Sequence, residues 1–193
     1  MAFRTKQQGA LTPREQLDRD YKTARVNLLL VVILTAVSVV STIFSEDGTY
    51  FVFSAAIPRY LVFMGCLLCG IYPNVDYGEV MDFEPFHEVV LIVMVVIATV
   101  IILAYFLCWL FSSKGRKVAL IIALILFAID TISLPILFDL SSILIDLVLH
   151  VVVIYYLVKG ISAINKLEKM GAEEVYPEEI SEQNQNPENE QNM

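Results

Sequence analysis

The sequence has few cysteines, few histidines and no surplus of basic charge, and each shortage excludes a class of protein. Three cysteines and two histidines among 193 residues are too few for a disulfide framework and lack the spacing of a structural zinc site. A formal net charge of -8, without basic patches interleaved with aromatic residues, excludes a nucleic-acid partner. The chain has no nucleophile elbow, phosphate-binding glycine-rich loop, HExxH pair or dinucleotide fingerprint. These absences argue against an enzyme.

Apolar residues are abundant instead, because 57% of the chain is hydrophobic and the mean hydropathy is +0.67. Four apolar segments reach the roughly 20 residues that a helix needs to cross a bilayer. We therefore predict an all-α integral membrane protein, a four-transmembrane-helix bundle with both termini cytoplasmic. The predicted parts are an N-terminal arm (1–25), spans at 26–45, 89–111, 118–138 and 140–158, an extracytoplasmic loop (46–88), a cytoplasmic turn (112–117) and an acidic, disordered cytoplasmic tail (159–193).

A fifth apolar segment, 51–72, is long enough that the chain could have either four or five spans. Pro58 would kink a continuous helix, and a helix that began there would reach only roughly 20 Å before Gly70. With four spans, 12 of the 13 basic residues fall on the cytoplasmic side, as the positive-inside rule requires. Only Arg59 then lies outside. We expect 51–72 to form an outer-leaflet or re-entrant element between the first two spans.

Two aspartates and a histidine lie within the last two predicted spans, where an isolated charge is costly. If the chain turns near Asp139, then Asp130 and His150 lie at the same depth, roughly 14 Å from the turn. Asp146 lies one helical turn from His150 on the same face. We interpret Asp130, Asp139, Asp146 and His150 as an ion or proton route. A divalent-metal site, with the metal unknown, and a hydrogen-bonded group that fixes helix register are the alternatives.

The loop before the second predicted span is rich in acidic side chains. Such a surface attracts hard cations and could concentrate them near an entrance. The alternative is that acidic residues stabilise the positive end of the following helix dipole. The residues of this predicted outer surface are Asp76, Glu79, Asp82, Glu84, His87 and Glu88.

Cys66 and Cys69 form a CxxC sequence, Cys66-Leu-Leu-Cys69, on the predicted extracytoplasmic side. With four spans, this arrangement resembles the disulfide-generating membrane oxidoreductases of the vitamin K epoxide reductase type. The resemblance implies thiol redox chemistry with a quinone. The chain departs from that pattern because it has no second extracytoplasmic cysteine pair to relay electrons.

These features favour a small cation- or proton-coupled transport protein, or the membrane subunit of a transporter complex, in the plasma membrane. Four spans rarely enclose a pathway alone, so the hypothesis implies a homo-oligomer or a larger membrane complex as well as the lipid bilayer. The competing hypothesis is a non-transporting membrane scaffold that recruits cytoplasmic partners. The third is the thiol-redox protein that would use Cys66 and Cys69. The sequence identifies no cofactor.

Overall fold

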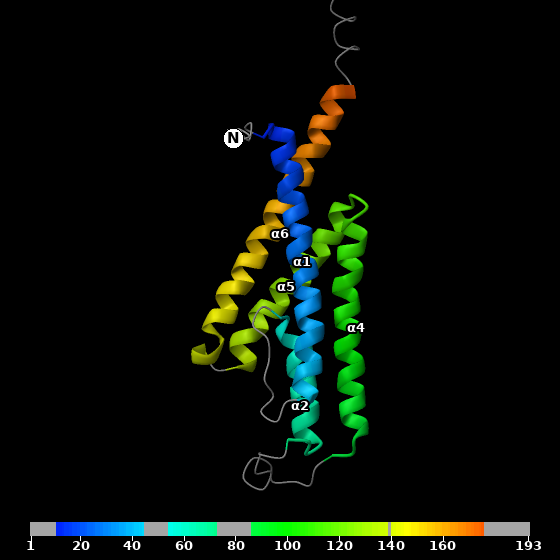
Figure 1. Cartoon of the computed structure of the whole chain (residues 1–193), viewed down its shortest axis with the longest axis vertical. Helices are drawn as coiled ribbons and strands as arrows, with labels where there is room; N and C mark the ends of the chain where they lie inside the picture. The colour runs from blue at the N-terminus through cyan, green and yellow to red at the C-terminus, as the bar shows by residue number, and fades with distance from the viewer. Residues whose placement is uncertain (1–10, 45–53, 73–85, 139, 176–193) are drawn as a thin grey trace, which may run out of the picture.

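The computed structural model describes residues 11–44, 54–72, 86–138 and 140–175, and these parts of the chain are entirely helical and turn (Figure 1). Four helices are long and apolar enough to cross a membrane, which confirms the predicted number of candidate spans. A fifth, of 13 residues, is too short for a full crossing. The helices are α1 (Pro13–Phe44), α2 (Ala56–Leu68), α4 (Val89–Ser112), α5 (Lys117–Leu137) and α6 (Leu140–Val175).

Helix α1 begins well before its apolar stretch because a capping box starts it. The Thr12 backbone N–H donates to the Glu15 carboxylate at 2.8 Å, and the Glu15 N–H donates to the Thr12 hydroxyl at 3.3 Å. Pro13 occupies the first helical position, where a missing N–H leaves no hydrogen bond unmade. Half of the predicted N-terminal arm is therefore helical, from Pro13 onward.

Helix α6 also exceeds its predicted span, since it runs for 36 residues. Residues 159–175, which we expected to be disordered, continue the helix, and this part of the predicted tail is corrected. Two kinds of contact stabilise this extension of the helix. Ala163 and Ile164 belong to the buried hydrophobic core, and Lys159 forms an ion pair with Asp20 of α1 at 2.9 Å. Its last turns project past the other helices (Figure 1). Residues 176–193 lie outside the described residues.

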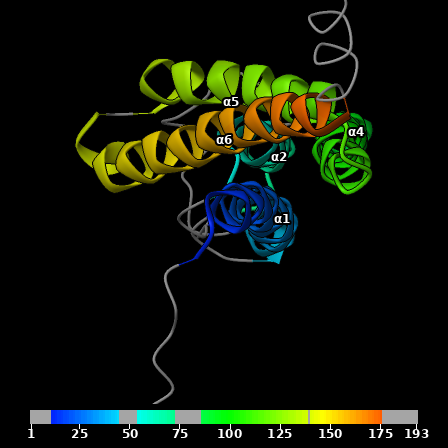
Figure 2. The same cartoon turned by 90° about the horizontal axis from the view of Figure 1, so that it is seen from above.

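Helix α2 lies inside the bundle, between α1 on one side and α5 on the other (Figure 2). It contacts α1, α4 and α5, and Ala56, Val62 and Cys66 are fully buried. Helix α2 is therefore covered by α1, α4 and α5. Its placement as an outer-leaflet or re-entrant element stays a prediction.

Two glycines lie at close contacts between helices. A Cβ added at Gly65 of α2 would lie 3.0 Å from Leu91 Cδ1 of α4. A Cβ added at Gly160 of α6 would overlap the Cβ of Ala24 on α1. Small residues at such crossings let helices pack without lipid between them. The α1–α6 crossing is thus set by Gly160 and Ala24.

Replacing Gly160 with alanine is expected to lower the free energy of unfolding by about 1–3 kcal/mol, because the rigid Ala24 methyl cannot move away from the added carbon. Gly171 is the matched control, since a Cβ there meets nothing within 4 Å. Thermal unfolding in detergent should show a loss for Gly160→Ala, none for Gly171→Ala, and recovery in Ala24→Gly/Gly160→Ala. Equal stability of the two single variants would contradict the close crossing.

Candidate functional site

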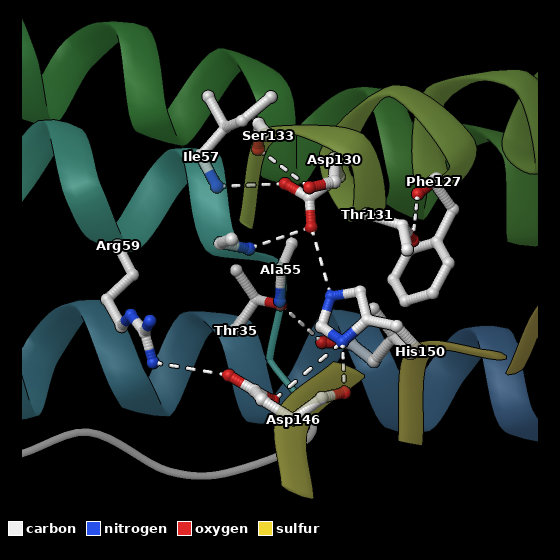
Figure 3. Close-up of polar contacts among 12 residues, drawn as sticks. Thr35, Ala55, Ile57, Arg59, Phe127, Asp130, Thr131, Ser133, Asp146 and His150 are labelled. Carbon is white, nitrogen blue, oxygen red and sulfur yellow. Dashed lines mark hydrogen bonds and ion pairs between the residues drawn. The ribbon is translucent and has the colours of Figure 1, made fainter. Parts of the chain in front are cut away.

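Four charged or titratable side chains meet in the interior of the bundle (Figure 3). Asp130 comes from α5, Asp146 and His150 from α6, and Arg59 from α2. Each is at most 2% exposed. Burial of this kind disfavours charge unless opposite charges and hydrogen bonds surround it, so the contacts of each group define what the cluster can do.

The Asp130 carboxylate holds the beginning of α2. Its Oδ2 accepts the backbone N–H of Ala56 and its Oδ1 that of Ile57, both at 2.8 Å. The first amides of a helix have no partner within it, and the N-cap residue of α2, Ala55, makes no side-chain cap. A carboxylate from another helix therefore performs the cap, at the positive end of the α2 dipole. Pro58, in the same first turn, needs no such partner.

His150 links the two aspartates. Its Nδ1 lies 2.8 Å from the Asp146 backbone carbonyl, and since a carbonyl only accepts, Nδ1 carries a proton and donates it. Its Nε2 lies 3.2 Å from Asp130 Oδ2. The ring stacks on Phe127 with centroids 4.7 Å apart and planes at 10°. The ring is thus fixed on three sides with Nε2 aimed at Asp130.

The contact between His150 Nε2 and Asp130 Oδ2 is a hydrogen bond only when one proton lies between them. With the proton on nitrogen, an imidazolium faces a carboxylate; with the proton on oxygen, a carboxylic acid donates to a neutral imidazole. Without it, two lone pairs oppose each other at 3.2 Å. The pair therefore has a form that holds the shared proton, on either Nε2 or Oδ2, and a form that lacks it. All of these arrangements keep the Nδ1 hydrogen bond.

Arg59 supplies the second positive group. Its Nη1 lies 3.5 Å from Asp146 Oδ2, and its guanidinium carbon lies 4.5 Å from the centroid of the Phe138 ring, close enough for a cation–π contact. Asp146 Oδ1 also lies 3.8 Å from His150 Nδ1. When the Asp130–His150 pair holds its proton, two acids and two bases balance, which is the condition for stable burial of charge.

Helix α1 completes the cluster through Thr35. Its hydroxyl donates to the Val31 carbonyl at 2.7 Å and accepts the Ala55 N–H at 2.8 Å. The entry to α2 is therefore held from both sides, by Thr35 on α1 and by Asp130 on α5.

The sequence argument placed Asp130 and His150 at the same depth and Asp146 one turn away, and the structure brings these three together. Asp139, the fourth residue of the predicted route, lies outside the described residues. The described residues contain no group of three or more histidine, cysteine or acidic side chains that could hold a metal ion, so the metal alternative gains no support there.

Most of the predicted acidic surface cannot be compared with the structure, because Asp76, Glu79, Asp82 and Glu84 lie outside the described residues. His87 and Glu88 are exposed where α4 begins. The His87 Nδ1 accepts the Val89 N–H at 3.3 Å, which makes it a cap for the first turn of α4.

Cys66 and Cys69 are both free thiols at the end of α2. Cys66 is buried, and Cys69 donates weakly to the His87 carbonyl at 3.5 Å. The Gly70 N–H donates to the Leu67 carbonyl and the Ile71 N–H to that of Cys66, with Gly70 at a φ of 68°. This is a Schellman motif, so the two cysteines lie on the last turn of a helix that the following glycine ends.

Arg59 and Thr35 were not among the residues that the sequence indicated for this site. A signal for Arg59 existed: it is the only basic residue between Arg25 and Lys114, and two buried aspartates need more positive charge than one histidine offers. The signal for Thr35 is its recurrence with Ser38, Thr42 and Ser45 at helical spacing, a pattern that favours helix packing over a polar site. Comparisons with protein-family models, with curated proteins and with solved structures found no match to this chain.

Proposed function

We propose that this chain is a proton-coupled membrane transport protein, or the membrane subunit of one, in which Asp130 and His150 bind the coupling proton. One observation carries the proposal: a buried acid and imidazole at 3.2 Å require a proton between them, and the same acid caps α2. Ionisable pairs in transmembrane bundles commonly form proton relays. The four candidate spans support the membrane setting.

Proton release would change the charge of the cluster by one unit. The Asp130 carboxylate would then face a neutral His150 while it still accepts the Ala56 and Ile57 amides. A gain of net negative charge in a medium of low dielectric strength is unfavourable, which favours either uptake of another cation or movement of α2. Movement of α2 would couple proton occupancy to the position of this short helix, and uptake of a cation would couple it to the binding of a second ion.

The setting we infer follows the distribution of basic residues: both termini cytoplasmic in the plasma membrane, and α2 re-entrant from the opposite side. The acidic residues of 73–88 would then face the extracytoplasmic solution and concentrate cations there. A five-helix chain of this size leaves little room for a pathway of its own, so the proposal includes a homo-oligomer or a larger membrane complex.

The test is proton flux into liposomes that contain the full-length protein and a trapped pH-sensitive dye. Asp130→Asn and His150→Gln are each expected to slow flux by about 100-fold, the contribution typical of a positioned proton-transfer group. Asp18→Asn, an exposed acid, and His87→Gln, the other histidine, are the matched controls and should leave flux unchanged. Wild-type liposomes no more permeable than protein-free ones would contradict proton transport.

A membrane scaffold is the second candidate, favoured by the protruding end of α6 (Figure 1). That end is charged, with Lys166, Glu168 and Lys169 in its last described turns. A scaffold would keep partner capture in Asp130→Asn and lose it when the chain is truncated after Gly160. The same two variants therefore separate the candidates.

A further inference from the structure

A groove separates α4 from α5 at the end of the bundle where these helices join. Its volume is about 660 Å³, within the range of roughly 300–1,000 Å³ typical of small-molecule sites. From Ala104 to Phe111 on α4 it extends about 10 Å along the helix axis, and Val118 and Ile122 face it from α5. The part of the groove between these α4 and α5 residues is therefore apolar.

The mouth of the same groove is basic. Arg116 and Lys117 line it, Lys114 lies in the adjoining turn, and the single acid of the lining is Glu168. Glu168 accepts from Lys117 at 2.6 Å, yet an ammonium has three donors and can serve a second acceptor. The mouth therefore has a surplus of positive charge.

The N-terminus of α5 opens at the same mouth. Its N-cap residue, Arg116, makes no side-chain cap. The Ala119 N–H donates to the Arg116 carbonyl, which leaves the Lys117 and Val118 amides and the positive end of the dipole available to an anion. Gly115 in the adjoining turn has a φ of 73°, a left-handed conformation that glycine adopts without strain. Helix dipole, two basic side chains and an apolar groove thus converge on one place.

In the membrane setting proposed above, the mouth of the groove would lie at the level of the lipid headgroups. Trp109, the only tryptophan of the chain, lies two residues before Phe111 on α4, and tryptophan is enriched at membrane interfaces. The Arg116 guanidinium carbon lies 5.9 Å from the Phe111 ring centroid. The basic end of the groove would therefore meet phosphate groups while its apolar length faces acyl chains.

We propose that this groove is a binding site for an anionic phospholipid of the surrounding bilayer. The phosphate is held by Arg116, Lys117 and the first amides of α5, and one acyl chain lies along Ala104, Leu107 and Ile122. Basic pockets between transmembrane helices recognise anionic lipids in this way. The site lies about 20 Å along α5 from Asp130, so lipid binding there can be measured separately from proton flux.

The test is native mass spectrometry of the full-length protein in detergent, titrated with palmitoyl-oleoyl phosphatidylglycerol or with phosphatidylcholine of the same chains. We expect tighter binding of phosphatidylglycerol. Each removed charge should weaken it by about fivefold, so Arg116→Gln/Lys117→Gln should weaken it by roughly 25-fold. Ile122→Trp should fill the groove without changing charge and reduce binding of both lipids.

The charge control is Arg19→Gln/Lys22→Gln, which removes two basic groups from the exposed face of α1 near the same end and should leave binding unchanged. Ala104→Trp repeats the steric test from the opposite wall if Ile122→Trp does not fold. Equal binding of the two lipids, or unchanged phosphatidylglycerol binding in Arg116→Gln/Lys117→Gln, would overturn the headgroup site. Unchanged binding in folded Ile122→Trp or Ala104→Trp would overturn the acyl-chain groove.

Discussion

Asp130→Ala is expected to lower the free energy of unfolding by about 2–6 kcal/mol, since two buried amide donors lose their acceptor and each such loss amounts to about 1–3 kcal/mol. The amides are those of Ala56 and Ile57, both 2.8 Å from the carboxylate. Unfolding in detergent, followed by circular dichroism, measures the loss. Hydrogen exchange should locate it, with faster exchange at the first turn of α2.

Two variants calibrate this result. Asp130→Asn keeps one acceptor oxygen, so about 1–3 kcal/mol should be lost. Ser133→Ala removes only a hydroxyl that donates to the Asp130 backbone carbonyl at 2.6 Å and should change stability by no more than about 1 kcal/mol. Asp130→Ala as stable as Ser133→Ala would mean that the carboxylate does not hold α2.

Arg59→Met is expected to destabilise the protein by about 3–5 kcal/mol, because it takes the guanidinium away from a buried Asp146. The double variant Arg59→Met/Asp146→Leu should regain most of this loss, since an apolar pair of similar volume avoids the desolvation of both charges. The measurement is a double-mutant cycle of unfolding free energies in detergent.

An exposed pair provides the contrast. Lys117 and Glu168 are 2.6 Å apart but 42% and 47% exposed, so Lys117→Met should change stability by no more than about 1 kcal/mol. If Arg59→Met/Asp146→Leu is less stable than either single variant, the two side chains do not stabilise each other through charge.

The candidate spans could be predicted because hydropathy and length suffice for them. The predicted segments 89–111 and 118–138 differ from α4 and α5 by one residue at each end or less. The N-terminal turns of α1 and the C-terminal turns of α6 were not predicted to be helical, because their sequences are polar. Their helicity depends on a capping box at Thr12 and on contacts such as that of Lys159 with Asp20. Hydropathy does not register either feature.

The candidate site was partly predictable. Asp130, Asp146 and His150 follow from helix geometry around one tight turn, where sequence distance fixes depth. Arg59 and the first amides of α2 are 71 or more residues from Asp130 along the chain, and their contact depends on how α2 enters the bundle. Periodicity within single helices carries no information on that entry, and the polar role of α2 therefore had to come from the structure.

The uninterrupted length of α6 has a mechanical consequence. His150 and Glu168 lie on one stiff rod, roughly 15 Å and 12 Å to either side of Gly160, where the rod crosses α1. A tilt of about 5° at that fulcrum would displace the two residues by about 1 Å in opposite directions. A rearrangement around the buried His150 would then strain the Lys117–Glu168 contact at the other end of α6.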